Sequence, residues 1–462
     1  MFSCLFKVPN TIKSKSRSFL GVATAMAGLY VCVPVMAEPV KPPLSPEMSL
    51  KQAVRTGLFS NPSYKEAQNN EMASRKRVRQ ARAGYFPNID LQGDGGYEST
   101  KNSATQDGNV ELFRRRISID VRQLVFDGFE TKYEVERQKG RAKAATFDLY
   151  EESEQTTFDI ITAYISVALQ RDLLRIAGKN VAKHEQILSD VRQSTEAGRT
   201  SRVDVDQVSA RLASARSDLS SIQQNLQDAR SDFKRLTGRF PGKLISLKDI
   251  SSGFERSLDD HLASVLKNSP ALNSAKADMR AAHAEYKQTM APFLPQINFE
   301  LSAQEAEDIG GVEGIDRTAS AGTSLNWNLY RGGEDAARRK EFEYRLAEAQ
   351  AIQARLAREV EDEVRKTWAA MKAAGEREAN FRIQADANEK LVAAYLQQFN
   401  LNRRTLLDVL DVQSELFRSQ SNAVSEKSEK LISEYRLLAL EGSLLEHFGI
   451  SRNDIAPMVA GK

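Results

Sequence analysis

Cysteine is almost absent from this sequence, and both copies lie near its start. Only Cys4 and Cys32 occur among the 462 residues. Both fall within the first 37 residues, a segment with the features of an export signal. Once that segment is removed the chain carries no thiol, which excludes a disulfide framework and any catalytic or redox cysteine.

The first 37 residues predict a signal peptide, followed by a linker over residues 38–48. A basic start leads into the apolar run Phe19–Val33, which is short for a membrane span, and residues 35–37 supply small side chains for cleavage. Residues 29–31 lack the small residue expected before a lipidated cysteine, which argues against an anchor at Cys32. The basic residues are Lys7, Lys13, Lys15 and Arg17.

Histidine is also scarce, and no enzyme motif is present. The sequence lacks a phosphate-binding loop, a nucleophile elbow and a dinucleotide-binding fingerprint. No two histidines share metal-ligand spacing. We therefore expect no enzyme, no metal site and no cofactor. The four histidines are His184, His261, His283 and His447.

An excess of either charge is missing too. The sequence has 65 basic and 62 acidic residues, and the signal holds four of the basic ones and no acidic one. The exported chain would therefore be close to neutral. The basic balance of the full sequence belongs to the signal, so nucleic acid is not an expected partner.

What is present is an internal repeat. "NPSYKEAQ" from Asn61 is echoed by "SPALNSAK" from Ser269, and "VFDGFE" from Val125 by "LYRGGE" from Leu329. The offset is 208 residues in the first pair and 204 in the second, so a variable loop absorbs four residues between them. We expect two repeats, over residues 49–238 and 261–449, with a joining segment at 239–260 and a tail at 450–462.

Each repeat predicts two long helices in sequence. No proline occurs between Pro87 and Pro241, or between Pro295 and Pro457. The residues between are rich in helix formers, so each repeat should hold one helix of about 67 residues, roughly 100 Å long. A second long helix should follow each. Such helices need partners to bury their apolar seams. The expected ranges are 130–196 and 202–236, then 334–400 and 406–448.

Four short segments alternate between apolar and polar residues, which predicts strands with one apolar face. Their lengths suit tilted membrane strands, with Phe126, Trp327 and Tyr330 in the place of an aromatic belt. A soluble sheet with one solvated face is the alternative. Four strands cannot close a barrel, so strands in lipid would require at least a dimer. The expected strands are about 89–97, 116–126, 297–304 and 319–329.

The turns between the paired helices carry matching capping signals. Ser201 with Asp204, and Thr405 with Asp408, each have the spacing of a capping box, in which hydroxyl and carboxylate bond each other's backbone amides. Capping explains both aspartates. It does not explain Arg404 or Asp411, because the first repeat has threonine and glutamine at the matching positions.

These features together resemble the TolC family of outer-membrane efflux and secretion channels. The resemblance rests on the two repeats, on "RRTLLDVLDVQSELF", and on Gly128, Gly332 and Gly333 at the strand-to-helix joins, and it covers about residues 49–449. It implies a mainly α fold, in which a homotrimer forms a 12-stranded membrane β-barrel and an α-helical coiled-coil tunnel. Short helices with residues 241–260 would form a belt around the tunnel.

The resemblance also implies a location and partners. The barrel would lie in the lipid of a Gram-negative outer membrane and the tunnel in the periplasm. A membrane fusion (adaptor) protein and an inner-membrane ABC transporter would dock at the tunnel tip. The sequence looks closest to the type I secretion branch, which includes adhesin export. The alternatives are an efflux duct with a proton-driven exporter, and a non-pore periplasmic coiled-coil protein.

The resemblance places a gate at the tip. Asp408 and Asp411 would narrow the pore, and their crowding in a trimer should raise some pKa values. Arg404 would hold the inner hairpin closed, with Asp204 as one partner. Phe399 stands where the family often has a tyrosine. Arg403, Ser201 and Thr405 would support the gate, although for Arg403 a solvated charge is the preferred interpretation.

Overall fold

The computed structural model describes residues 48–106, 108–242, 256–401 and 403–456. All of them belong to one compact unit, Ser45–Lys462. The expected signal peptide, nearly all of the linker, most of the joining segment and the last six residues lie outside the described residues.

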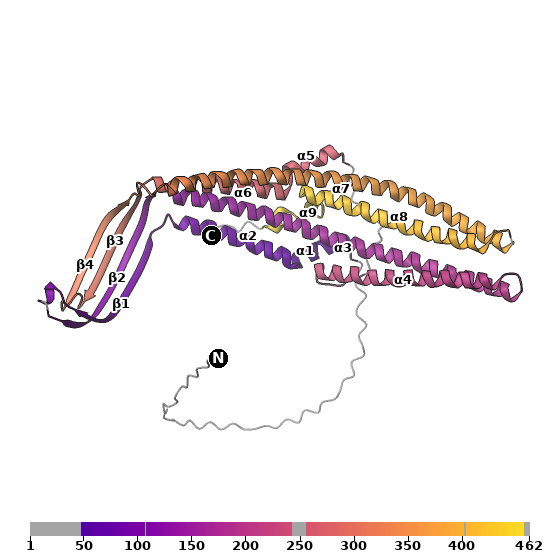
Figure 1. The fold of residues 1–462 in the computed structure, drawn as a ribbon, viewed down its shortest axis with the longest axis horizontal. Helices are drawn as coiled ribbons and strands as arrows, with labels where there is room; N and C mark the ends of the chain where they lie inside the picture. The colour runs from indigo at the N-terminus through magenta and orange to yellow at the C-terminus, as the bar shows by residue number, and fades with distance from the viewer. Residues whose placement is uncertain (1–47, 107, 243–255, 402, 457–462) are drawn as a thin grey trace, which may run out of the picture. The chain divides into compact units, whose positions relative to one another are not determined.

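The four strands form one antiparallel sheet in the order β1-β2-β3-β4 (Figure 1). Odd-numbered residues place an apolar set on one face, including Ile89, Leu91 and Ile117, and all three are exposed. The even-numbered face is polar, with Asp90, Asp120, Ser302 and Ser320 in register across the sheet. The strands are β1 (Asn88–Thr100), β2 (Val110–Asp127), β3 (Gln296–Glu307) and β4 (Ile315–Asn326).

The expected strand ends were wrong in most places. β1 and β2 extend three and six residues further toward their connecting turn, because Gly93, Gly95 and the run 114–116 break the apolar alternation but not the backbone pairing. β4 begins at Ile315 and ends at Asn326, so Trp327 and Tyr330 lie beyond it in the connection to the next helix. That connection must turn at Gly332 and Gly333, which both have positive φ.

Two helical hairpins follow the strands (Figure 1). The first helix of each hairpin covers the residues expected for it. The last helix ends at Glu441 instead of residue 448, because Gly442 adopts φ +69° and terminates it. A short helix then begins at Leu444, and another begins at Arg452 in the expected tail. No described helix has the length and apolar character needed to cross a membrane. The helices are α3 (Glu130–Glu196), α4 (Arg202–Thr237), α7 (Glu334–Asn400), α8 (Leu406–Glu441), α9 (Leu444–His447) and α10 (Arg452–Ile455).

Shorter helices open each repeat and pack along the long ones. Pro62 and Pro270 each start the second of these, at the position where a missing amide costs nothing. In the second repeat α6 lies against both α3 and α7, so it joins the two hairpins. The elements are α1 (Leu50–Ser60), α2 (Pro62–Ala83), α5 (Leu258–Asn268) and α6 (Pro270–Gln288), with 3-10 turns η1 (Ser103–Thr105) and η3 (Ala291–Phe293).

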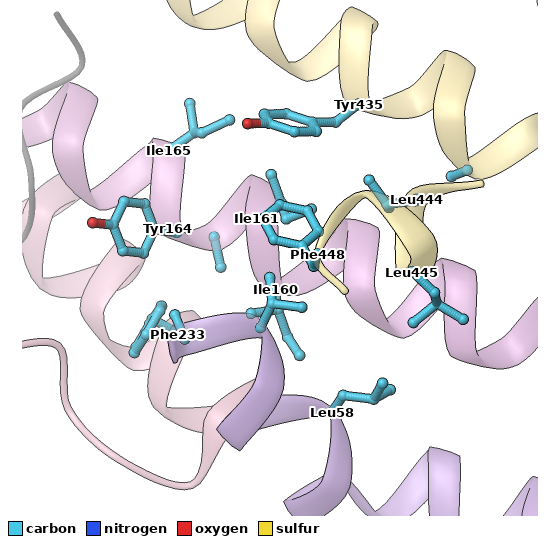
Figure 2. Close-up of a cluster of buried hydrophobic side chains, with 14 of the residues drawn as sticks. Leu58, Ile160, Ile161, Tyr164, Ile165, Phe233, Tyr435, Leu444, Leu445 and Phe448 are labelled. Atoms are coloured by element: carbon cyan, nitrogen blue, oxygen red, sulfur yellow. The ribbon is translucent and has the colours of Figure 1, made fainter. Parts of the chain in front are cut away.

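The main core joins both repeats around the middle of α3. Figure 2 shows its side chains packed against one another. Burial of each large apolar side chain contributes about 1.5–3 kcal/mol to the stability of the fold. The Tyr164 hydroxyl also donates to the Met48 carbonyl over 2.9 Å, which ties down the start of the described chain. The labelled residues are Leu58, Ile160, Ile161, Tyr164, Ile165, Phe233, Tyr435, Leu444, Leu445 and Phe448.

A buried carboxyl anchors the C-terminal segment to this core. Glu154 on α3 is 4% exposed and accepts a hydrogen bond from the Leu444 amide over 3.1 Å, at the start of α9. Burial raises the pKa of Glu154 to about 8, because desolvation outweighs the two backbone amides that favour its charge. Near neutral pH the folded protein therefore holds a proton here that the unfolded chain releases.

This proton makes stability fall as pH rises between the unfolded pKa, near 4.5, and about 8, because the folded state binds more protons over that range. We expect the unfolding temperature of Glu154→Gln, measured by circular dichroism, to fall less from pH 5 to pH 8 than that of the parent. Glu152→Gln, at a less buried neighbour, should retain the parent's slope. Equal slopes in all three proteins would contradict the assignment.

The join between β2 and α3 depends on one glycine. Gly128 has φ +67°, and a Cβ there would lie 2.7 Å from the Ala291 carbonyl oxygen. Gly332 has a similar φ of +64° but open space around it. Gly332→Ala should cost about 1–2 kcal/mol of stability from backbone strain alone, and Gly128→Ala should cost more. Unfolding temperatures test this, and equal losses would refute the close-packing account.

Candidate functional site at the hairpin tips

The two turns between the paired helices lie at the ends of the helices remote from the sheet (Figure 1). Each 67-residue helix is roughly 100 Å long, so the turns are far from the strands along the chain. Residues 197–201 join α3 to α4, and residues 401–405 join α7 to α8. We call these two turns, with the adjoining helix ends, the hairpin tips.

Both predicted capping boxes form. Ser201 caps α4 and the Asp204 carboxylate accepts from the Ser201 amide over 3.0 Å. Thr405 caps α8, where the Asp408 amide donates to the Thr405 hydroxyl over 3.3 Å and that hydroxyl donates to the Asp408 carboxylate over 2.8 Å. Both aspartates are thus held by the local structure of their own helix starts.

Within one chain the pKa of Asp408 is lowered, which is opposite to the rise expected from crowded carboxylates. The Thr405 hydroxyl is the main cause, with smaller help from the Thr405 amide and the Arg404 guanidinium. Hydrogen bonds to the charged form favour ionisation. The carboxylate therefore keeps its charge well into the acidic range, and the cap should weaken only as pH falls through this lowered pKa.

Arg404 is held by its own hairpin and does not reach its expected partner Asp204. Its guanidinium lies 3.9 Å from the centre of the Tyr395 ring, and its Nε donates to Gln398 over 3.2 Å. It is also 3.8 Å from the Asp408 carboxylate. Among the described residues no bond joins it to Asp204. Within a single chain Arg404 stacks on Tyr395 of α7 instead. An Arg404–Asp204 bond in the assembled trimer stays a prediction.

Sequence reasoning missed Tyr395. The family resemblance places a tyrosine at Phe399, but in this chain the tyrosine at the tip is Tyr395, one helical turn earlier. Phe399 itself is half-buried and packs into the apolar contact between the hairpins. The signal that could have found Tyr395 is its spacing of four residues from Phe399, since residues four apart on a helix share a face.

The charged contact between the two hairpins is made by Asp411. Its carboxylate on α8 accepts from Arg211 on α4 over 2.9 Å, and both side chains are about half exposed. Arg211 was also missed. It lies seven residues after Asp204, and that heptad spacing could have placed it on the same face of α4.

Beneath the charges lies an apolar seam that contains side chains of all four long helices. Val409 and Leu410 of α8 are fully buried, and Leu406 nearly so. One buried polar contact crosses the same seam, from the Gln413 amide on α8 to Asn180 on α3 over 3.0 Å. Its buried members are Val181, Ile187, Leu188, Val191, Val208, Leu212, Ala215, Leu406, Val409 and Leu410.

Magnitudes show which contact holds the tips together. An exposed ion pair such as Arg211–Asp411 contributes about 0.2–1 kcal/mol. Burial of each Val or Leu contributes about 1.5–3 kcal/mol. Three such residues on α8 therefore outweigh the ion pair several-fold. The apolar seam therefore contributes more than the ion pair to the packing of the hairpin tips.

The remaining predicted site residues have simpler places. Arg403 is exposed at the turn. Gly128, Gly332 and Gly333 all adopt positive φ at the strand-to-helix joins, remote from the tips. In the described part of the chain, no group of three or more His, Cys, Asp or Glu side chains is placed to hold a metal ion.

The duplicated architecture, with four strands and paired long helices, matches a known family. The model of the outer membrane efflux protein family fits residues 55–239 and 262–443. The chain belongs to this family. Its two matched ranges correspond to the two repeats.

Relatives in this family carry both efflux and secretion names. The outer membrane efflux protein BepC of Brucella suis is 25% identical over 329 residues, which are 71% of this chain and 72% of BepC. The alkaline protease secretion protein AprF of Pseudomonas aeruginosa is 21% identical over 418 residues, or 86% of this chain and 85% of AprF.

Solved structures share the fold. The Campylobacter jejuni CmeC outer membrane channel superimposes with a TM-score of 0.76 at 13% identity, over 86% of each chain. CusC gives a TM-score of 0.75 at 15% identity, over 88% of this chain and 93% of CusC. The predicted fold class, mainly helical with two strand–strand–hairpin repeats, is confirmed. Its membership of the outer membrane efflux protein family makes the protein a non-enzymatic transport protein of the Gram-negative outer membrane. The alternative of a coiled-coil protein without a pore is therefore not retained.

The seam makes a prediction about local opening at the tips. Val409→Ala should lower the opening free energy by about 1–3 kcal/mol, whereas Asp411→Asn should lower it by less than about 1 kcal/mol. Hydrogen-exchange mass spectrometry of peptides from residues 181–215 measures this directly. Leu407→Ala, on the same turn but 47% exposed, is the matched control and should change little. A larger effect from Asp411→Asn than from Val409→Ala would contradict the ranking.

Proposed function

We propose that three copies of this chain form the outer-membrane channel-tunnel of a type I secretion system. The channel exports a protein substrate, with large adhesins as the favoured class, and works with a membrane fusion protein and an inner-membrane ABC transporter. The observation that carries the channel is the sheet: it has free edges at β1 and β4 and an exposed apolar face. Lipid does not tolerate open edges, so further copies must complete a barrel.

The gate belongs to the same proposal. The α7–α8 hairpin moves away from the α3–α4 hairpin when partners compete for the tips, which separates Arg211 from Asp411 and opens the seam. Arg404, stacked on Tyr395, fixes the turn that begins α8. Asp408 and Asp411 carry negative charge at the tip, so the closed pore favours cations. In a trimer, three apolar seams and three Arg211–Asp411 pairs hold the tips closed, and partners that bind the tips release them.

A second candidate is the outer-membrane duct of an efflux pump with a proton-driven exporter. The name of BepC, and that of the probable efflux pump protein TtgC of Pseudomonas putida at 22% identity, favour it. AprF and the Bordetella pertussis protein CyaE stand in the same range of identity. Cross-linking in cells, followed by identification of the captured inner-membrane protein, separates the two. An ABC transporter supports secretion, and a proton-driven exporter supports efflux.

The gate assignment predicts conductance in planar lipid bilayers. Arg404→Ala, and Asp408→Ala combined with Asp411→Ala, should both raise single-channel conductance, because each loosens the turn or removes the bond across the hairpins. The double change should also reduce cation selectivity, since it removes the tip carboxylates. Arg403→Ala, at an exposed site on the same turn, is the control. Unchanged conductance and selectivity in both variants would refute the gate.

A further inference from the structure

The turn at the far end of the sheet from the helices folds back over its neighbours. β2 residues 110–114 pair with β1 alone, and pairing of β2 with β3 begins only at Arg115 with Glu307. The β1–β2 hairpin therefore projects beyond the β3–β4 hairpin. The β3–β4 turn, residues 308–314, lies beside this projecting part.

Two hydrogen bonds fasten the β3–β4 turn to the first hairpin. The Gly310 amide donates to the Glu98 carboxylate over 3.0 Å, and the Asn102 side-chain amide donates to the Gly310 carbonyl over 2.9 Å. Gly311 lies so close to Thr105 that any side chain there would collide with the Thr105 methyl group. Glu98 is on β1, which does not neighbour β3 or β4 in the sheet, so the turn must cross β2 to reach it.

The turn crosses on the polar face. Glu98 is even-numbered, and it shares that face with Arg114, which lies 3.7 Å from Glu98 and 3.2 Å from Asp94. Ala306, also even-numbered, is buried although it lies next to the turn at the free end of β3. The apolar face opposite remains open. The turn thus covers the side of the sheet that would face the interior of a barrel.

The turn has a defined internal structure. The Asp308 amide donates to the Gly314 carbonyl over 3.0 Å, and the Gly314 amide donates to the Asp308 carboxylate over 2.9 Å. Gly310, Gly311 and Gly314 all adopt positive φ, which a glycine accepts at little cost. Because these internal hydrogen bonds hold the shape of the turn, we expect it to move as a unit when its bonds to Glu98 and Asn102 break.

We propose that the β3–β4 turn, latched by Glu98 and Asn102, forms an outer constriction that limits by size what enters the channel from outside. This rests on the proposed trimer, in which three such turns project into one barrel mouth. The constriction is separate from the gate at the hairpin tips and acts at the opposite end of the channel. Substrates that leave must displace the turns, whereas bulky solutes outside meet them latched.

Labelling of intact cells tests the constriction without opening the tip gate. Both natural cysteines lie in the expected signal peptide, so Ser320→Cys provides one thiol on the polar face, about 17 Å along β4 from the turn. The probes are a small charged methanethiosulfonate and a bulky maleimide-linked polyethylene glycol, both added outside. Adding Glu98→Ala should speed labelling by the bulky probe roughly tenfold, as expected for loss of a hydrogen bond to a charged acceptor. The small probe should label equally fast with and without it.

Matched controls identify the cause. Glu111→Ala removes an exposed glutamate from the opposite face of β2 and should leave both rates unchanged. Asn102→Ala removes the second latch bond and should act like Glu98→Ala, so it tests the same latch if Glu98→Ala does not assemble. Equal bulky-probe rates in the parent and both latch variants would overturn the constriction, and so would an equal increase in Glu111→Ala. If even the small probe never reaches Ser320→Cys, the channel itself is refuted together with the constriction.

Discussion

Two helices of 67 residues impose the constraint on which the rest of the structure depends. A helix of this length cannot bury its apolar stripe alone, so each must pack along others for its whole course. This packing forms the main core in the middle of the helices, where α3 contacts α1, α4, α8 and α9. It forms the apolar seam at the tips. Duplication of one strand–strand–hairpin unit supplies these partners from within a single chain.

Apolar and charged side chains make different contacts at the hairpin tips. Val409 and Leu410 hold the hairpins together, and the pair Arg211–Asp411 crosses between them at the surface. Asp408 serves its own helix start, as Asp204 does in the first repeat. Only Asp411 differs in kind, since its partner belongs to the other hairpin. That asymmetry between the repeats supports the proposal that the second hairpin is the moving element of the gate.

Much of the fold could be predicted, because its signals are local. Proline-free runs rich in helix formers indicated α3 and α7, capping boxes marked the starts of α4 and α8, and the repeat offset placed both tips. The end of α8 was missed although the sequence held the signal. Gly442 matches Gly238, where the first repeat's helix stops, and both adopt positive φ. The ends of β1 and β2 near their connecting turn were missed because backbone pairing continues through glycines and arginines that interrupt the apolar alternation.

The contacts of the candidate site could not be predicted in the same way. Arg404 stacks on Tyr395, and Asp411 meets Arg211 across 200 residues of sequence. Such partners depend on the register between helices, which a single sequence does not specify. The contact between the β3–β4 turn and β1 could not be predicted for the same reason, since Glu98 and Gly310 are 212 residues apart in the sequence.

The central claim is that the channel opens by parting the two hairpins at the tip. It is tested by conductance of Arg211→Cys with Asp411→Cys in the Arg404→Ala background, joined by a short cleavable thiol cross-linker. We expect cross-linking to return the raised conductance to the parent's level and cleavage to raise it again. The same treatment of Glu185→Cys with Arg216→Cys, a pair within the first hairpin, should have no effect. Conductance that stays raised with the Arg211–Asp411 positions cross-linked would contradict the account.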